Sequence, residues 1–375
     1  MAIKKILELT GILEKAGLLN ENPQTFEMKY RKSTQNSDVR RFLELETPKV
    51  SDLTETLQIR NNGRLYAIRF DLNSGINNHK KQVCAGLILR RILKGRLNEN
   101  KDTLIDGGNY NSASALKYYA QMLGLKGMYI MSKLFLQRPD IIDSLEADNF
   151  KIEIAPENKS KSMEREFYDY LYRRMKDPSF SQNKVCLWHA KYSGKAMYPF
   201  GIEIAESLKT TLDCVVSCLG AGSTLEGTQI AVQDYCLEKR LKKPEIFIAE
   251  HELSPLFAKL FSFSRTQLPA WLTEEIRDEI KLNEYLEVKG LPHTVIGPHY
   301  QEINPLISRK ALRRIDKVIQ YSERDWMETQ KYLEIKGICI GNSSAANIAV
   351  ALGLANQGKQ VLTVIFEPFR WFYKK

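Results

Sequence analysis

The sequence has few of the residues that build disulfide-rich or metal-stabilised proteins. Only six of its 375 residues are cysteine, no two have the Cys-x-x-Cys spacing, and its five histidines do not cluster with them. A disulfide framework or a structural metal would need such clusters. We therefore predict no metal site, and we expect the cysteines to be reduced thiols of a cytoplasmic protein.

Long apolar runs are absent as well. No stretch approaches the roughly 20 apolar residues that cross a bilayer, and Glu8, Glu14 and Lys15 interrupt the N-terminal segment. A signal-peptide core is therefore missing, and the acidic residues argue against a transit peptide. There is no fixed-period repeat and no low-complexity tract. We predict a globular cytoplasmic protein with room for two domains and no membrane partner.

The charge is unbalanced, with 55 Lys and Arg against 45 Asp and Glu, a formal net charge of +10. These basic residues are spread along the chain, and pairs such as Arg90-Arg91 and Arg313-Arg314 lie on predicted helix faces. A solvated surface explains them better than a nucleic-acid site. We predict no nucleic-acid partner. The alternative, a nucleic-acid binder, would show affinity that falls steeply with salt.

Apolar runs and helical periodicity alternate along most of the chain. This alternation predicts an α/β fold with mostly parallel strands, numerous enough for two sheets. Strands are expected at 64–70, 103–105, 128–131, 150–154, 185–187, 212–216, 246–249, 316–321 and 361–366. Helices are expected from about Lys81 and at 115–123, 163–175, 228–239 and 323–333, with an Ala-rich helix after Ser344. Before them lies a helix-prone arm, with a loop expected at 20–37.

One glycine-rich stretch stands out, Ser217 to Gly227, between a predicted strand and a predicted helix. Glycine lets the backbone approach an anion closely, and the free amides at a helix start point toward it. Leu225 replaces the third glycine of a dinucleotide fingerprint, and no Gly-Lys-Ser/Thr follows. The stretch thus favours a phosphate site, with a purely structural turn as the alternative.

Four separated stretches then follow a known order. Gly220–Gly227 is similar to a Gly-Thr-Gly-Gly-Thr-x-x-Gly phosphate loop, and Gly108-Asn109 to a Ser-Gly-Asn loop. Asn78–Val83 lies where a Ser-x-Lys-Asp-Arg-Ile segment begins a helix, and Gly341–Ala346 is similar to Gly-x-Ser-Ser-Gly-Ala. From about Glu46 onward the chain resembles the tryptophan-synthase-β-like (fold type II) family of pyridoxal-phosphate (PLP) enzymes, nearest to cysteine synthase and cystathionine β-synthase.

The resemblance implies two open, mostly parallel α/β domains with PLP in the cleft between them. We expect an N-terminal helical and loop arm at 1–45, a smaller α/β domain at 82–190, and a larger one formed by 46–81 with 191–375. The larger domain would carry the phosphate loop. We also expect a homodimer and a small amino-acid substrate.

The resemblance also implies a role for each cofactor residue. Lys80 would hold PLP as a Schiff base and move protons, because a lysine desolvated against an apolar helix serves both purposes. Counting forward from Asn73 places His79 at the family's lysine position. Lys80 fits that position only if the turn contains one extra residue. Lys81 is the alternative Schiff-base lysine. Asn109 would bind the ring hydroxyl and Ser343 the pyridine nitrogen. The phosphate would lie on Gly220, Ala221, Gly222, Ser223 and Thr224.

The substrate loop departs from the family pattern. Where the family holds the substrate carboxylate with hydroxyls, this sequence has Asp106, Gly107 and Tyr110, beside Gly108 and Asn111. An acidic residue there opposes a carboxylate unless it points away or pairs with a cation. The family's Gln-Phe-x-Asn-Pro-Ala-Asn stretch is also unrecognisable at 186–192.

We therefore expect PLP-dependent β-replacement or β-elimination on serine, cysteine or an O-activated serine, as in cysteine synthase. Two alternatives stay open. One is a lyase similar to d-cysteine desulfhydrase and aminocyclopropane-carboxylate deaminase, favoured by the sequence from Asp102 to Gly108. The other is a non-catalytic relative that acts as a partner protein.

Overall fold

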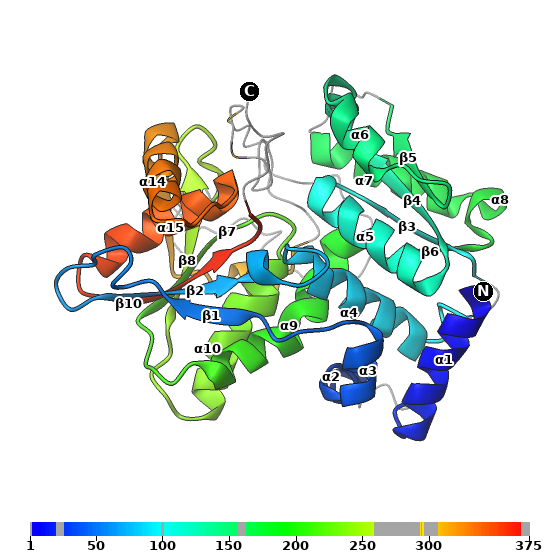
Figure 1. The fold of residues 1–375 in the computed structure, drawn as a ribbon, viewed down its shortest axis with the longest axis horizontal. Coiled ribbons are helices and arrows are strands. Elements are labelled where there is room, and N and C mark those ends of the chain that lie inside the picture. The colour runs from blue at the N-terminus through cyan, green and yellow to red at the C-terminus, as the bar shows by residue number, and fades with distance from the viewer. Residues whose placement is uncertain are drawn as a thin grey trace.

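Two sheets lie side by side in the computed structural model (Figure 1), which describes residues 2–19, 26–98, 101–156, 163–258, 293, 295 and 307–368. The larger sheet has the order β1-β2-β10-β7-β8-β9 and the smaller one β5-β4-β3-β6. Among the strands of the described residues, β1 pairs antiparallel with β2, and the other neighbouring strands pair in parallel. The expected α/β fold with two mostly parallel sheets is confirmed.

The strands follow the apolar runs of the sequence. In the larger sheet they are β1 (Lys49–Asp52), β2 (Arg64–Arg69), β7 (Cys214–Cys218), β8 (Glu245–His251), β9 (Lys317–Tyr321) and β10 (Gln360–Ile365). In the smaller sheet they are β3 (Thr103–Gly107), β4 (Lys126–Met131), β5 (Phe150–Ile154) and β6 (Lys184–Cys186). All residues of β3 and β7 are buried, as expected for strands covered on both faces.

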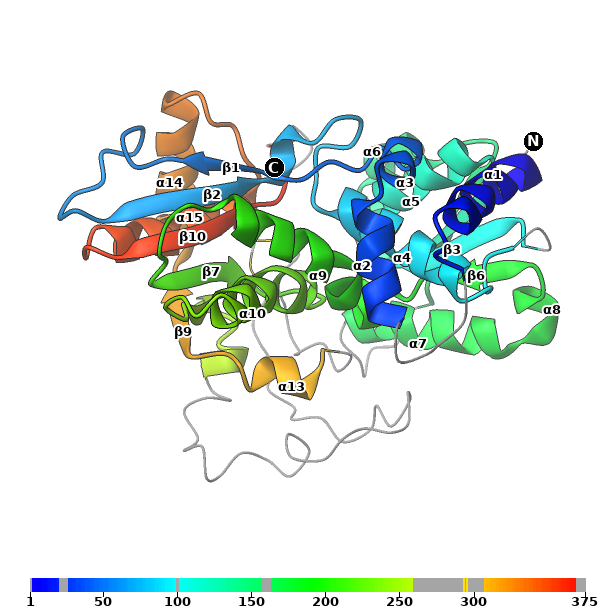
Figure 2. The ribbon, with the colours of Figure 1, turned by 90° about the horizontal axis from the view of Figure 1, so that it is seen from below.

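Helices cover both faces of each sheet. On the larger sheet, α14 (Glu323–Ile335) and α15 (Asn342–Ala355) lie on one side, and α9 (His189–Ser207) and α10 (Ile230–Glu238) on the other (Figure 1). On the smaller sheet, α5 (Tyr110–Leu123) and α7 (Met163–Lys176) lie on opposite faces (Figure 2). Between the two sheets, α4 (Lys80–Leu93) packs against α9. The shorter elements are η2 (Phe70–Leu72), η3 (Lys133–Gln137), α6 (Pro139–Leu145), α8 (Pro178–Ser181), η4 (Leu225–Gln229) and α13 (Arg309–Leu312).

The N-terminal arm contains more helix than the sequence predicts. It forms α1 (Ala2–Lys15), α2 (Phe26–Gln35) and α3 (Ser37–Phe42), so the loop expected at 20–37 is wrong from Phe26 onward. Tyr30 explains the α2 helix, because it is buried and its hydroxyl donates to the Ala196 carbonyl at 2.5 Å. Tertiary packing thus stabilises a helix whose sequence is mostly polar.

Helix α9 is absent from the sequence predictions. It carries Gly194, Pro199 and Gly201 in its interior, and these residues weaken helical propensity. It matters because it packs on α4, on η4 and on α10. The domain boundaries at 81/82 and 190/191, which fall at the starts of α4 and α9, stay a prediction. Within the described ranges, no helix is both long and apolar enough to cross a membrane.

Candidate functional site

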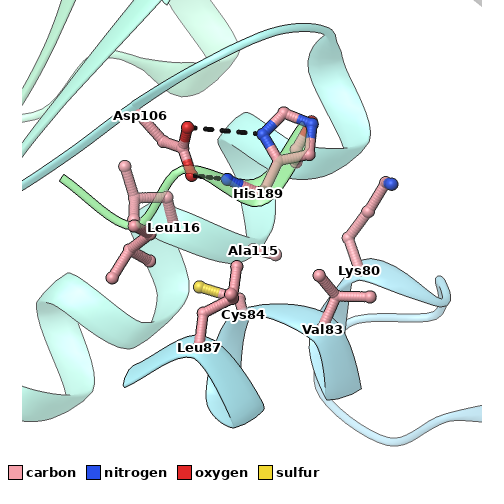
Figure 3. Close-up of a pocket in the computed structure, with 10 residues that line it drawn as sticks. Lys80, Val83, Cys84, Leu87, Asp106, Ala115, Leu116 and His189 are labelled. Carbon is pink, nitrogen blue, oxygen red and sulfur yellow. Dashed lines mark hydrogen bonds and ion pairs between the residues drawn. The ribbon is translucent and has the colours of Figure 1, made fainter. Parts of the chain in front are cut away.

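Lys80 opens helix α4 and faces a small pocket (Figure 3). Its amide donates to Asn78 Oδ1 at 2.8 Å, and the preceding His79 amide donates to the Phe366 carbonyl at 3.1 Å. These bonds fix the turn, and α4 supplies the apolar neighbours Val83, Cys84 and Leu87. Burial lowers the pKa of the Lys80 amine to about 8, although Asp106 and Glu367 oppose this shift. A buried amine of this kind is neutral for more of the time than a surface lysine.

Lys81 faces elsewhere and already has partners. Its Nζ donates to the Ser74 carbonyl at 2.8 Å and lies 3.2 Å from Glu46 Oε1, and its side chain is fully buried. His79, at the family's lysine position by residue count, packs on the Phe366 ring at 4.8 Å. Burial, with Lys80 nearby, holds the pKa of His79 well below its usual value. This arrangement supports Lys80 over both neighbours.

The Gly220–Thr224 loop connects β7 to a helical segment, as its sequence predicts. The first helical bond runs from the Glu226 amide to the Gly222 carbonyl at 3.0 Å, so the amides from Gly222 to Leu225 precede the helical ladder. Gly222 has φ +87°, a conformation that disfavours side chains. Ser223 and Thr224 are buried within this turn. The loop therefore offers the backbone donors that a phosphate requires.

Ser343 and Asn109 also lie where strands end. Ser343 is buried in the first turn of α15, and its carbonyl contacts the Cys218 thiol at the end of β7, 3.9 Å away. Asn109 precedes α5, and its Oδ1 accepts a bond from the Ser112 hydroxyl at 3.1 Å. Asn109 follows the carboxyl end of β3, and Ser343 contacts the carboxyl end of β7. Ligands bind at this edge of the strands in open α/β sheets.

The substrate loop contains a pair that the sequence does not reveal, Asp106 and His189. Asp106 Oδ2 accepts from the His189 amide at 3.0 Å, and Oδ1 accepts from the Gly107 amide at 2.9 Å and lies 3.4 Å from His189 Nδ1. Both side chains are buried and line the same pocket as Lys80 (Figure 3). Asp106 therefore does not extend free into the pocket.

Gly108 and Asn111 complete this loop. A Cβ on Gly108 (φ +148°) would lie 2.7 Å from Tyr129 Oη and 2.9 Å from His189 Cε1, so the histidine ring packs directly against this glycine. Asn111 Nδ2 donates to the buried carboxylate of Glu367, which follows β10 of the other sheet. Tyr110, the first residue of α5, is partly exposed. The loop is thus tied to both sheets.

Sequence reasoning missed His189 and Glu367. His189 follows β6, which pairs in parallel with β3, so it emerges at the same sheet edge as Asp106. The sequence predicts both of these strands, at 103–105 and 185–187. Their parallel pairing is the one signal that could have indicated that His189 lies near Asp106. Glu367 stands 256 positions from Asn111, and nothing local marks it.

Two mostly parallel α/β sheets, a buried lysine at a helix start between them and a glycine turn after a central strand define a fold type II PLP enzyme. A family model described as "Pyridoxal-phosphate dependent enzyme" matches residues 52–367. The chain belongs to this family, and its cofactor is PLP. The resemblance noted from the sequence is confirmed, and the protein is an enzyme of this class.

Solved structures share the fold. An O-acetylserine-dependent cystathionine β-synthase from Helicobacter pylori is 20% identical, with a TM-score of 0.64 over 87% of this chain and 94% of that one. A cysteine synthase from Entamoeba histolytica is 19% identical, with a TM-score of 0.62 over 87% of each chain. A hydrogen sulfide-producing enzyme from Fusobacterium nucleatum is 15% identical, with a TM-score of 0.66 over 88% and 97%. A search of curated protein sequences gives no match.

Proposed function

We propose that the protein catalyses β-replacement or β-elimination on serine, cysteine or an O-activated serine, with Lys80 as the residue that holds PLP. The observation that carries this proposal is the buried Lys80 amine, whose pKa is lowered to about 8 and which faces a pocket at the end of β3. The names of the structural neighbours support the reaction class, since they include an O-acetylserine-dependent enzyme and a hydrogen sulfide-producing one.

The residues present suit the cofactor. The Gly220–Thr224 turn has backbone donors and no side chain at Gly222, and Ser343 supplies a neutral hydroxyl near the ends of β7 and α15. When bound, PLP withdraws electrons from the substrate's α-carbon, which lets the β-substituent depart. A serine hydroxyl does not hold the pyridine nitrogen protonated as a carboxylate would, and this limited withdrawal suits β-chemistry.

Lys80 Nζ would take the α-proton and return it. Its lowered pKa keeps part of the amine neutral near pH 7, which a base requires. The apolar side chains of Val83, Cys84 and Leu87 reduce the access of water to that amine. The substrate's carboxylate would lie at the Gly107–Asn111 loop, next to the Asp106–His189 pair.

Borohydride reduction of the purified protein, followed by peptide mapping, tests the lysine. We expect the pyridoxyl label on Lys80, no label in Lys80→Gln, and normal labelling in the matched control Lys81→Gln if that variant folds. Label on Lys81 in the wild type would shift the site by one residue. A purified protein without PLP absorbance, and unable to take up added PLP, would favour the non-catalytic alternative.

Amino-acid titrations test the substrate class. We expect the cofactor spectrum to change with l-serine, l-cysteine or O-acetyl-l-serine. A response to d-cysteine alone would instead favour the lyase alternative similar to d-cysteine desulfhydrase. We further propose a cytoplasmic homodimer, for which light scattering would give twice the chain mass of 43.2 kDa.

A further inference from the structure

We propose that Glu226 is a positioning residue for the cofactor, because its carboxyl group holds the start of α13 against the turn that takes the phosphate. This inference rests on the proposed function, since it takes the Gly220–Thr224 turn as the phosphate site. Glu226 occupies one of the two positions that the Gly-Thr-Gly-Gly-Thr-x-x-Gly pattern leaves unspecified. Its role therefore belongs to this chain and does not follow from the pattern.

The Glu226 side chain lies between two elements that are distant in the sequence. Its Oε1 accepts a hydrogen bond from the Ser308 amide at 3.1 Å, and Ser308 directly precedes α13. Its Oε2 lies against α9, where a Cβ added at Gly194 would be 2.4 Å away. The side chain is half-buried. These contacts leave the carboxyl group little room for another position.

The residue before Ser308 covers the phosphate turn. Ile307 is buried, and its Cγ1 would lie 3.2 Å from a Cβ added at Gly222. Ile307 also belongs to the buried apolar cluster that contains Leu225, at the end of the turn. Because Ile307 and Ser308 are adjacent, the Glu226–Ser308 hydrogen bond fixes where the isoleucine packs on the turn.

Local bonds and packing make the start of α13 a firm partner for Glu226. The Ser308 hydroxyl accepts the Ala311 amide at 3.4 Å, and this cap fixes the first turn of the helix. Ala311 and Leu312 are buried in the same apolar cluster as Ile307. The phosphate turn is therefore packed against an anchored segment, which keeps its amides in a fixed arrangement before the anion binds.

The charge of Glu226 decides how it can act beside a phosphate. An ionised carboxylate there would repel the phosphate, whereas a protonated carboxyl group accepts the same amide without that repulsion. Burial raises the pKa of Glu226, although the Ser308 amide and Lys195 oppose this shift. The side chain thus acts as a hydrogen-bond acceptor rather than as a charge. Glutamine, which has a similar shape and an amide oxygen, should be able to replace it.

The test measures PLP binding by the full chain after removal of the cofactor. Absorbance titrations give the dissociation constant of PLP, and the phosphorus NMR resonance of bound PLP reports the surroundings of the phosphate without any turnover. The variants are Glu226→Gln and Glu226→Ala. The matched control is Asp316→Ala, because Asp316 Oδ2 also accepts a backbone amide, that of Ile246 at 2.8 Å. That bond lies at the amino end of β8, at the other edge of the sheet from the phosphate turn.

We expect Glu226→Ala to weaken PLP binding about 3- to 10-fold, the usual effect of losing one hydrogen bond. Its phosphorus resonance should move toward that of free PLP, because the turn fits the phosphate less closely. Glu226→Gln should bind PLP within about twofold of the wild type. Asp316→Ala should lower the melting temperature as Glu226→Ala does, yet keep the wild-type affinity for PLP.

Ile307→Ala tests the proposal if Glu226→Ala does not fold. It keeps the Glu226–Ser308 bond and removes the side chain that packs on Gly222. We expect weaker PLP binding and the same displacement of the phosphorus resonance. Since Glu226 acts through Ile307, the double variant should weaken PLP binding by less than the product of the two single effects. Wild-type affinity in Ile307→Ala would overturn the proposal.

Unchanged PLP affinity in Glu226→Ala, with only a lower melting temperature, would assign Glu226 to packing and overturn the proposal. A glutamine variant as weak as the alanine variant would assign the effect to charge, which also overturns it. If Gly222→Val retains PLP, the phosphate binds elsewhere, and the proposed function is then wrong about the phosphate site. The two failures are therefore distinguishable.

Discussion

The loop after β7 and the loop after β3 share one design, a buried parallel strand followed by a glycine turn and a helix. They differ in what surrounds them. The β7 loop presents the backbone amides of consecutive residues, from Gly222 to Leu225. The β3 loop is bonded to distant side chains: Asp106 to His189, and Asn111 to Glu367.

The difference follows from the task that we propose for each loop. A phosphate is the same in every PLP enzyme, and a short run of backbone donors suffices to bind it. An amino-acid substrate has to be distinguished from its analogues, which requires side chains brought together from several elements. Breaking one loop should therefore remove the cofactor, whereas breaking the other should spare the cofactor and change the substrate.

Gly222→Val should give the largest effect, a loss of PLP affinity of about 100-fold or more. A valine would be strained at φ +87°, and its Cβ would lie 3.2 Å from Ile307 Cγ1 and enter the space of the phosphate. Cofactor absorbance after dialysis measures the change. Gly353→Ala, an open position in the exposed face of α15, is the control and should retain full occupancy. Full occupancy in Gly222→Val as well would show that the phosphate binds elsewhere.

Gly108→Ala should have the complementary effect. Its Cβ would lie 2.7 Å from Tyr129 Oη and 2.9 Å from His189 Cε1, so the histidine ring has to move. We expect PLP occupancy to stay near that of the wild type, while serine affinity falls by about tenfold or more. Absorbance before and after adding serine measures both quantities. Loss of the cofactor together with the substrate response would erase the distinction between the two loops.

The smallest effect should be in the pH dependence of cofactor uptake. With a pKa of about 8, Lys80 is roughly 10% neutral at pH 7, against about 0.03% for an ordinary lysine near 10.5. Because only the neutral amine attacks the PLP aldehyde, the uptake rate of the cofactor-free protein should rise with pH and level off above about pH 8. Stopped-flow absorbance measures the rate. If the uptake rate still rises tenfold per pH unit above pH 9, the amine that attacks PLP lies outside this pocket.

The sequence predicts most of the fold because the strands carry apolar runs that bury on both faces. Strand β5 coincides with its expected range, and α7 differs from its own by one residue. Helix α9 was missed because Pro199 and two glycines read as helix breakers, whereas close packing in the structure tolerates them. Local pattern also cannot reveal a pair such as Asp106 and His189, 83 positions apart, until the strand pairing is known.

Helix α9 has a mechanical consequence for the proposed site. His189 begins this helix, and farther along Gly194 and Gly201 bring its backbone against Glu226 and Gly227 of η4, where any Cβ would collide. Contacts this close leave α9 little freedom to slide along η4. The helix therefore keeps a fixed spacing between the phosphate turn and the substrate pocket. The start of α9, where His189 lies, and the turn proposed to hold the phosphate should therefore keep the same separation whether or not ligands are bound.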